Sequence, residues 1–149
     1  FAAKREITFC SYKKDQNKEK YLSETESLVD LDRSFSFELA DLLMHFIPAI
    51  SDGISYFNNE RFWECHEILE GVWKNCTGDE KFLVQGLILV AAGLVHYQKD
   101  EDEICISIFN RALAKLEYSN GQYHNIDIDK IKNTVTEMIN TNDISSFLI

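Results

Sequence analysis

The segment Phe82–Val95, FLVQGLILVAAGLV, is the longest apolar run of the chain and decides its fold class. Apolar side chains lie nearly all round the helical wheel of this segment, and Gln85 is its polar exception. Such a helix needs cover on every side, so we expect a central helix from about Glu80 to Lys99. Four small residues along it should let neighbouring helices approach closely: Gly86, Ala91, Ala92 and Gly93. The run is too short to cross a bilayer.

Amphipathic patterns with a helical period precede this central segment. A predicted helix begins near Phe35, with Ser34 as its N-cap. Pro48 should then begin or kink a further helix that runs to about Phe57. Directly before the central helix, Thr77-Gly-Asp-Glu80 has the composition of a capping box.

Helical patterns also follow the central segment. Asp100 should cap an amphipathic helix that runs to about Tyr118, and Gly121 should mark a stop. Asp127 should cap a last helix. No convincing strand or tandem repeat is present. The predicted fold class is therefore all-α, a single-domain multi-helical bundle of about five to seven helices over residues 34–149.

The charge of the chain is unevenly distributed. The formal net charge of the 149 residues is −10, but residues 1–33 form a polar leader whose first part is rich in lysine. This leader is either a loose arm or a first helix. An acidic body disfavours a nucleic-acid role. We therefore expect no nucleic acid and no membrane as partner, but a protein or a small molecule. The pattern predicts no oligomeric state.

The four cysteines form no CxxC pair. Three of them, Cys65, Cys76 and Cys105, lie in apolar helical stripes, whereas Cys10 lies in the leader. This pattern favours reduced, buried thiols in a cytosol-like compartment, and it argues against disulfides and a structural zinc site. The leader lacks the apolar core of a signal peptide.

A second informative stretch, Asn58–Trp73, places four glutamates, one histidine and two tryptophans on one predicted helix that ends near Cys76. Asn58 or Asn59 is its predicted N-cap. On the helical wheel His66 lies at the edge of the apolar arc, next to Glu70. Because these two residues are four positions apart, their side chains can meet.

Two interpretations of this pair are open. His66, Glu67 and Glu70 are candidates for general-base catalysis, and His66 and Glu70 are candidate metal ligands. Alternatively, His66 is a core-edge histidine whose carboxylate partner holds two helices in register, and His66→Ala would then cost about 1–3 kcal/mol. The spacing alone favours this structural interpretation. The segment is not an HExxH motif, because Glu70 occupies the place of the second histidine.

Further candidate binding residues surround the pair: Trp63, Glu64, Trp73, Gln85, His96 and Arg111. Trp63 lies among carboxylates and should cover the cluster. Gln85 and His96 share one stripe of the central helix but lie about 16 Å apart, so at most one can face His66. Arg111 should either pair with a glutamate of Asn58–Trp73 or lie solvated at an edge.

The motifs of three successive helices resemble a family known as domain of unknown function 309. They are Trp63-Glu-Cys-His-Glu-Ile-Leu-Glu-Gly-Val-Trp73, then Gln85-Gly-Leu-Ile88 with Ala91-Ala92 and His96, then Arg111-Ala-Leu-Ala-Lys-Leu116. The resemblance covers about residues 57–116. Cys65 and the acidic turn at Lys99–Glu103 depart from its pattern. The resemblance implies a compact helical fold and a cytoplasmic or plastid-stroma location, but no established activity.

Two classes of function fit these observations. The favoured one is a small intracellular binding or scaffold module with a His/Glu/Trp polar cluster, and it requires no cofactor. The alternative is a small metal-assisted or His–Glu general-base enzyme of hydrolase type. The sequence has no Gly-rich phosphate loop, nucleophile elbow or dinucleotide fingerprint that would favour a standard enzyme class.

Overall fold

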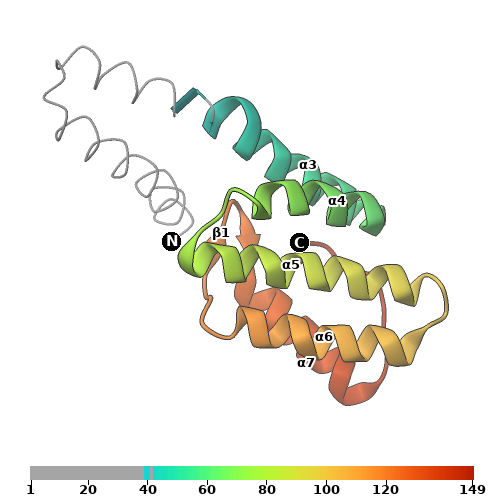
Figure 1. Ribbon diagram of the computed structural model, residues 1–149. Helices are drawn as coiled ribbons and strands as arrows, with labels where there is room; N and C mark the ends of the chain where they lie inside the picture. Colours follow the sequence, from blue (N-terminus) through green and yellow to red (C-terminus); the bar gives the residue numbers. More distant parts are fainter. Residues whose placement is uncertain (1–38, 41) are drawn as a thin grey trace, which may run out of the picture.

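The computed structural model describes residues 39, 40 and 42–149 of the chain. The predicted leader, the Ser34 cap and Cys10 lie outside the described residues. Within them the chain forms a π-helical turn, five α-helices and a small hairpin (Figure 1). The elements are η1 (Leu42–Phe46), α3 (Ile47–Asn58), α4 (Phe62–Trp73), α5 (Gly78–Tyr97), α6 (Asp102–Leu116), β1 (Gln122–Tyr123), β2 (Ile126–Asp127) and α7 (Ile128–Thr141). The predicted all-α fold class is confirmed.

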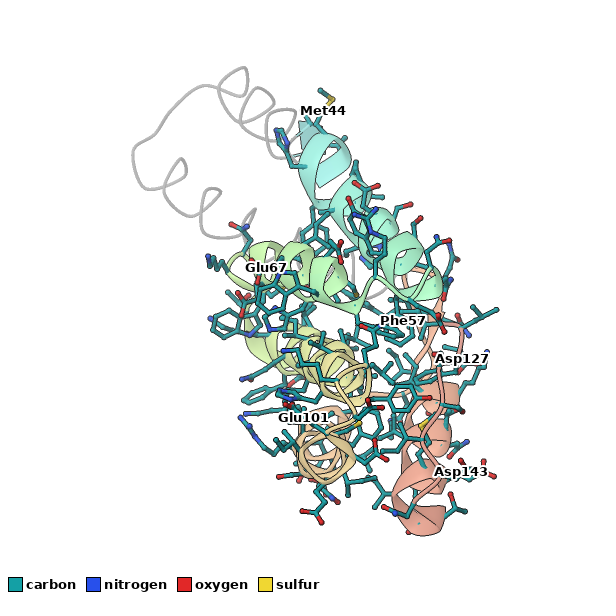
Figure 2. The ribbon with its side chains drawn as sticks, turned by 90° about the vertical axis from the view of Figure 1, so that its right-hand side faces the viewer. Met44, Phe57, Glu67, Glu101, Asp127 and Asp143 are labelled. Carbon is teal, nitrogen blue, oxygen red and sulfur yellow. The ribbon has the colours of Figure 1, made fainter. Side chains whose placement is uncertain are left out.

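The helices pack mainly against their neighbours in the sequence. α3 packs on α4, α4 on α5, α5 on α6 and α6 on α7 (Figure 1). Figure 2 shows the resulting stack from the side, with Met44 at one end and Asp143 at the other. Successive antiparallel helices joined by short connections give this arrangement.

The helix α5 is the centre of the domain, as its sequence predicts. Most of its apolar and small residues are buried between α4 and α6: Leu83, Val84, Gly86, Leu87, Ile88, Val90, Ala91, Gly93 and Leu94. Two glycines set the distance to α6. A Cβ atom on Gly86 would lie 2.6 Å from Leu116, and one on Gly93 would lie 2.6 Å from Phe109. Phe82 is the exception, because its side chain is exposed.

Two predicted helix starts are confirmed. Pro48 lies in the first turn of α3, directly after the π-helical turn η1, as a proline that begins or kinks a helix should. Asp127 caps α7, and its Oδ1 accepts a hydrogen bond from the backbone N–H of Lys130 at 3.0 Å. Gly121 has a positive φ of 74°, which suits its predicted role as a stop.

Two predicted caps are wrong because a reversed turn precedes the helix, and a third, Thr77, is the N-cap of α5 without the predicted capping box. Arg61, not an asparagine, precedes α4, after the chain reverses at Glu60 with φ 58°. Glu101, not Asp100, precedes α6, because Asp100 itself has φ 59°. Thr77 makes no side-chain cap hydrogen bond, and the other end of the predicted capping box is drawn into the core.

That other end is the buried Glu80, whose Oε1 accepts a hydrogen bond from the hydroxyl of Tyr123 at 2.9 Å. Tyr123 belongs to a feature that sequence analysis missed, the β1–β2 hairpin. Its turn residues, His124 and Asn125, both have positive φ, as two-residue hairpin turns require. Strands of two residues are too short to leave an alternating pattern in the sequence.

The described cysteines are free and buried: Cys65, Cys76 and Cys105. This agrees with the prediction of buried thiols for these three positions. No helix among the described residues has the length and apolar character that crossing a membrane requires.

Candidate functional site

The helix α4 presents the candidate residues on its outer side because its inner side is fixed by the core. Phe62, Cys65, Leu69 and Val72 are buried against the neighbouring helices. Their spacing is that of one apolar stripe on a helix. The residues between them, among them Trp63, His66, Glu67 and Glu70, are therefore turned toward the edge and the surface of the domain.

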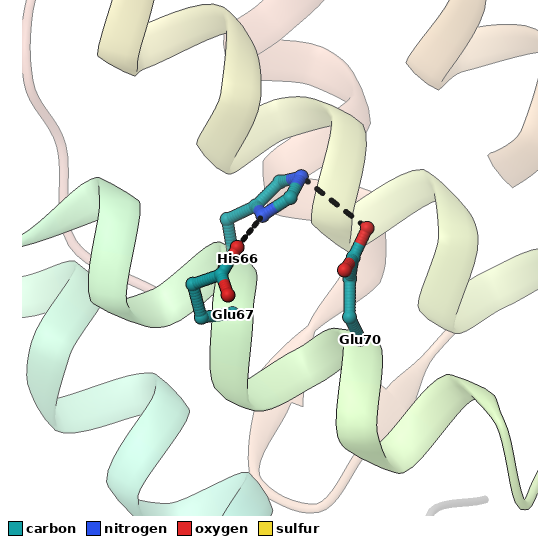
Figure 3. A group of neighbouring side chains, drawn as sticks. All are labelled: His66, Glu67 and Glu70. Carbon is teal, nitrogen blue, oxygen red and sulfur yellow. Dashed lines mark hydrogen bonds and ion pairs between the residues drawn. The ribbon is translucent and has the colours of Figure 1, made fainter.

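The imidazole of His66 lies between two carboxylates (Figure 3). Its Nδ1 is 3.3 Å from Oε1 of Glu67, and its Nε2 is 3.7 Å from Oε1 of Glu70. The indole of Trp63 stacks on the same ring, with 5.4 Å between centroids and 8° between planes. We call Trp63, His66, Glu67 and Glu70 the α4 site. The predicted meeting of His66 with Glu70, and the predicted cover by Trp63, are both present.

The α4 site is open to solvent. The side chain of His66 is 19% exposed, whereas those of Glu67 and Glu70 are 53% and 46% exposed. Trp63 as a residue is 58% exposed. A carboxylate in such a position stays hydrated when its partner is removed, and exposed ion pairs contribute little to stability. The premise of the structural interpretation, a carboxylate left unpaired inside the protein, is therefore not met.

A neighbouring ion pair reduces the number of carboxylates that are available at His66. Nε and Nη2 of Arg61 both donate to Oε1 of Glu64, at 3.1 and 3.0 Å. Hydrogen bonds from the backbone and then from Arg61 lower the pKa of Glu64. Glu64 is thus already paired with Arg61, and the acidic groups that remain at His66 are Glu67 and Glu70.

The α4 site has the donor atoms of a cation site. One ligand atom each from His66, Glu67 and Glu70 lies within 4.8 Å of the other two. Imidazole nitrogen and carboxylate oxygen are ligands of zinc and other divalent transition metals. With three protein ligands, coordination positions would remain open for water or for a group of a bound molecule.

Two contacts set the register of the antiparallel helices α4 and α5. Near the connection, Nζ of Lys81 lies 4.4 Å above the ring of Trp73. At the other end, the side-chain amide of Gln98 donates to the backbone oxygen of Glu60 at 2.8 Å. Gln85 is partly buried on α5, and no hydrogen bond or ion pair among the described residues joins its side chain to His66.

His96 does not join the α4 site. Its Nδ1 pairs with Oε2 of Glu101 at the turn between α5 and α6. The prediction that either Gln85 or His96 reaches His66 is thus wrong for His96. The physical reason is local, since the reversed backbone at Asp100 brings Glu101 directly against the end of α5.

The remaining predicted binding residues lie apart from the α4 site. Arg111 is exposed on α6, which packs on α5 and α7, and in the described part of the chain it forms no ion pair with α4. The predicted pairing with a glutamate of that helix is therefore wrong, and the solvated alternative holds. Trp73 is partly buried beneath Lys81.

Sequence reasoning missed several polar contacts around these helices. The Arg61–Glu64 pair has a signal, since the residues are three apart at a helix start. The His96–Glu101 pair spans a turn, and the Tyr123–Glu80 bond joins residues 43 positions apart. Neither spacing is a helical repeat, so no local sequence pattern predicts these two contacts.

The fold and site together define a small helical domain with a His–Glu–Trp cluster on the outer side of α4. The family described as Domain of unknown function (DUF309) matches residues 50–108, from within α3 to within α6. This match agrees with the resemblance that the motifs of the three helices predicted. The comparison with curated proteins gave no match. The family description assigns no activity.

Proposed function

We propose that the protein is a small helical binding module whose α4 site holds a cationic ligand. The observation that supports this proposal is that three donor atoms, from His66, Glu67 and Glu70, lie within 4.8 Å of one another on an exposed helix face. All three atoms can donate electron density to a cation when the imidazole is neutral. The ligand is a divalent metal ion or the cationic group of a partner.

The surroundings of the three donors support this proposal. The exposed indole of Trp63 holds the His66 ring by stacking and offers an aromatic face to a cation. The net charge of −10 favours the approach of cations and opposes that of anions. The side chains of Glu67 and Glu70 are about half exposed, so their pairs with His66 should contribute little to the stability of the fold. Ligand binding is a better explanation for this arrangement.

The proposal is tested by titrating the purified protein with Zn²⁺, Ni²⁺ and an arginine-rich peptide, with calorimetry and tryptophan fluorescence as readouts. We expect saturable binding of at least one of these cations. His66→Ala should abolish metal binding. The double variant Glu67→Gln with Glu70→Gln should lower the affinity for every cation by about tenfold or more. Glu137→Gln on α7 is the matched charge control and should bind as the wild type does.

The pH dependence separates a site from surface attraction. Protons compete with a metal for the imidazole nitrogen, so metal affinity should fall as the pH is lowered. Binding that is equal in His66→Ala, or equal losses in the Glu137→Gln control, would contradict the proposal. So would the absence of any saturable cation binding in the wild-type protein.

The alternative function is a metal-assisted or general-base enzyme of hydrolase type, and one observation favours it. Three protein ligands with open positions are the pattern of catalytic rather than structural zinc sites. Hydrolysis of activated esters by the metal-loaded protein, and its loss in His66→Ala, would support the enzyme.

Scaffold function, protein partners and a cytoplasmic or plastid-stroma location remain predictions. The predicted reducing compartment is tested by counting free thiols on denatured protein without reductant.

A further inference from the structure

A pocket of about 260 Å³ opens between the first turns of α5 and the last turns of α6. It shares no residue with the α4 site. Its lining residues are Asp79, Phe82, Ala114, Lys115, Tyr118 and Ser119. Pockets for drug-sized ligands occupy roughly 300–1,000 Å³. A pocket just below this range suits a ligand of amino-acid size.

Two aromatic side chains form walls of this pocket and are left uncovered by the fold. Phe82 is 54% exposed and Tyr118 is 84% exposed. Phe82 is the residue that breaks the otherwise buried pattern of α5. Phe82 belongs to α5 and Tyr118 follows α6, and their exposed rings provide flat apolar surfaces on which another ring can stack.

Opposite charges line the same pocket without pairing with each other. Among the described residues, no ion pair joins Asp79 to Lys115, although both border the pocket. Nζ of Lys115 lies 5.2 Å from the ring centre of Phe82, so the positive charge stands over an aromatic wall. One carboxylate and one ammonium group are thus available to a ligand that carries both charges.

A serine adds a polar group to the pocket lining. Ser119 is only 3% exposed, yet it borders the pocket. Its backbone oxygen accepts from Lys132 at 2.9 Å, whereas the described residues provide no hydrogen-bond partner for its hydroxyl. A serine hydroxyl can donate and accept a hydrogen bond, so it can bind a polar group of a ligand.

We propose that this pocket binds a free aromatic α-amino acid. Its ring would lie between Phe82 and Tyr118, its carboxylate would meet Lys115, and its ammonium group would meet Asp79. The net charge of −10 opposes a ligand with net negative charge, whereas a zwitterion carries none. The ligand is thus defined by three features together: an aromatic ring, a carboxylate and an ammonium group.

The experiment uses L-phenylalanine as the probe, with calorimetry and amide chemical shifts of the full chain as readouts. Three analogues each lack one feature: 3-phenylpropionate lacks the ammonium group, phenethylamine lacks the carboxylate and L-leucine lacks the ring. We expect L-phenylalanine to shift amide signals around Phe82 and Lys115. Each analogue should bind at least about tenfold more weakly, as the loss of one charged or stacking contact predicts.

Variants locate the binding on the protein. Asp79→Asn and Lys115→Gln should each lower the affinity for L-phenylalanine by about tenfold. Tyr118→Ala should lower this affinity as well. All three positions are at the surface, and melting curves verify that each variant folds. Lys74→Gln, an exposed lysine at the end of α4, is the matched control and should leave binding unchanged.

Two results would overturn the proposal. The first is the absence of shifts at the pocket up to the solubility limit of L-phenylalanine. The second is equal binding of N-acetyl-phenylalanine amide, which has the ring but neither charge. That second result would instead indicate an aromatic side chain of a peptide or protein as the occupant.

Discussion

The indole of Trp63 lies flat on the imidazole of His66, with 8° between the two ring planes. The stack holds the histidine in place on an exposed helix face, with Glu67 and Glu70 at its two nitrogens (Figure 3). A histidine fixed in this way keeps its nitrogen lone pairs or protons directed at the surface. The pair of rings therefore orients the α4 site without burying it.

Removal of the histidine should have only a small effect on stability. We expect His66→Ala to lower the free energy of unfolding by less than about 1 kcal/mol, because both carboxylates remain hydrated. This revises the cost of about 1–3 kcal/mol that a buried, unpaired carboxylate would bring. Urea unfolding measures the difference. A loss of several kcal/mol would show that the cluster is structural after all.

The approach of α5 to α6 at two glycines should be intolerant of a single methyl group. Gly86→Ala and Gly93→Ala each place a Cβ 2.6 Å from a buried side chain, Leu116 or Phe109, and should cost about 1–3 kcal/mol. Gly71→Ala is the matched control, since its Cβ meets no atom within 4 Å. That variant should gain about 0.5–1 kcal/mol from helix propensity. Equal melting temperatures for all three variants would contradict the packing.

The buried hydrogen bond between the hairpin and α5 should contribute measurably to stability. Tyr123→Phe removes the hydroxyl that donates to Glu80 and should cost about 1–3 kcal/mol. Tyr118→Phe removes a hydroxyl from a tyrosine that is almost fully exposed, and its cost should be close to zero. Thermal unfolding of both variants tests the contrast. Indistinguishable variants would mean that the buried bond adds nothing net.

Alkaline pH should weaken the fold through its buried thiols. Burial raises the pKa of Cys65 from 9.0 to about 12, and burial with the nearby charge of Asp102 raises that of Cys105 to about 12. The folded protein therefore holds these protons more tightly than the unfolded chain does. The resulting stabilisation is complete below pH 9.0 and is lost as the pH rises toward about 12.

Urea unfolding at stepwise higher pH measures this loss, and Cys65→Ala is the comparison. The variant begins less stable because of its cavity, but its stability should fall less steeply above pH 9.0. Parallel pH profiles for the variant and the wild type would assign the alkaline loss to other groups.

Much of the fold follows from local sequence patterns. The apolar wheel of α5, the proline of α3 and the aspartate that caps α7 each act over a few residues, and all three are found where the sequence predicts them. The meeting of His66 with Glu70 is predictable for the same reason, because helical geometry alone brings residues four apart together.

What the sequence does not predict depends on distant parts of the chain. The turns at Glu60 and Asp100 use positive φ without glycine, so no residue type marks them. The position of Glu80 depends on Tyr123, and the exposure of Arg111 depends on which helices flank α6. Periodicity identifies the face of a helix that is buried, but it does not identify the neighbour that buries it.

One side chain closes a long loop of the chain. Nδ2 of Asn58 donates to the backbone oxygen of Ile149 at 3.1 Å, and the backbone N–H of Ile149 donates to Oδ1 of Asn58 at 2.9 Å. Beside this pair the ring of Phe147 packs edge-on against Phe57. The residues that follow α7 are thereby fastened to the corner between α3 and α4, 91 positions earlier in the sequence.

This fastening has a consequence for how the domain opens. A stack of helices that contact only their neighbours can fray one hairpin at a time. The two hydrogen bonds between Asn58 and Ile149 couple the α3–α4 corner to the segment after α7, so loosening after α7 should also expose that corner to solvent. Amide hydrogen exchange should therefore report one shared opening event for two regions that are far apart in the sequence.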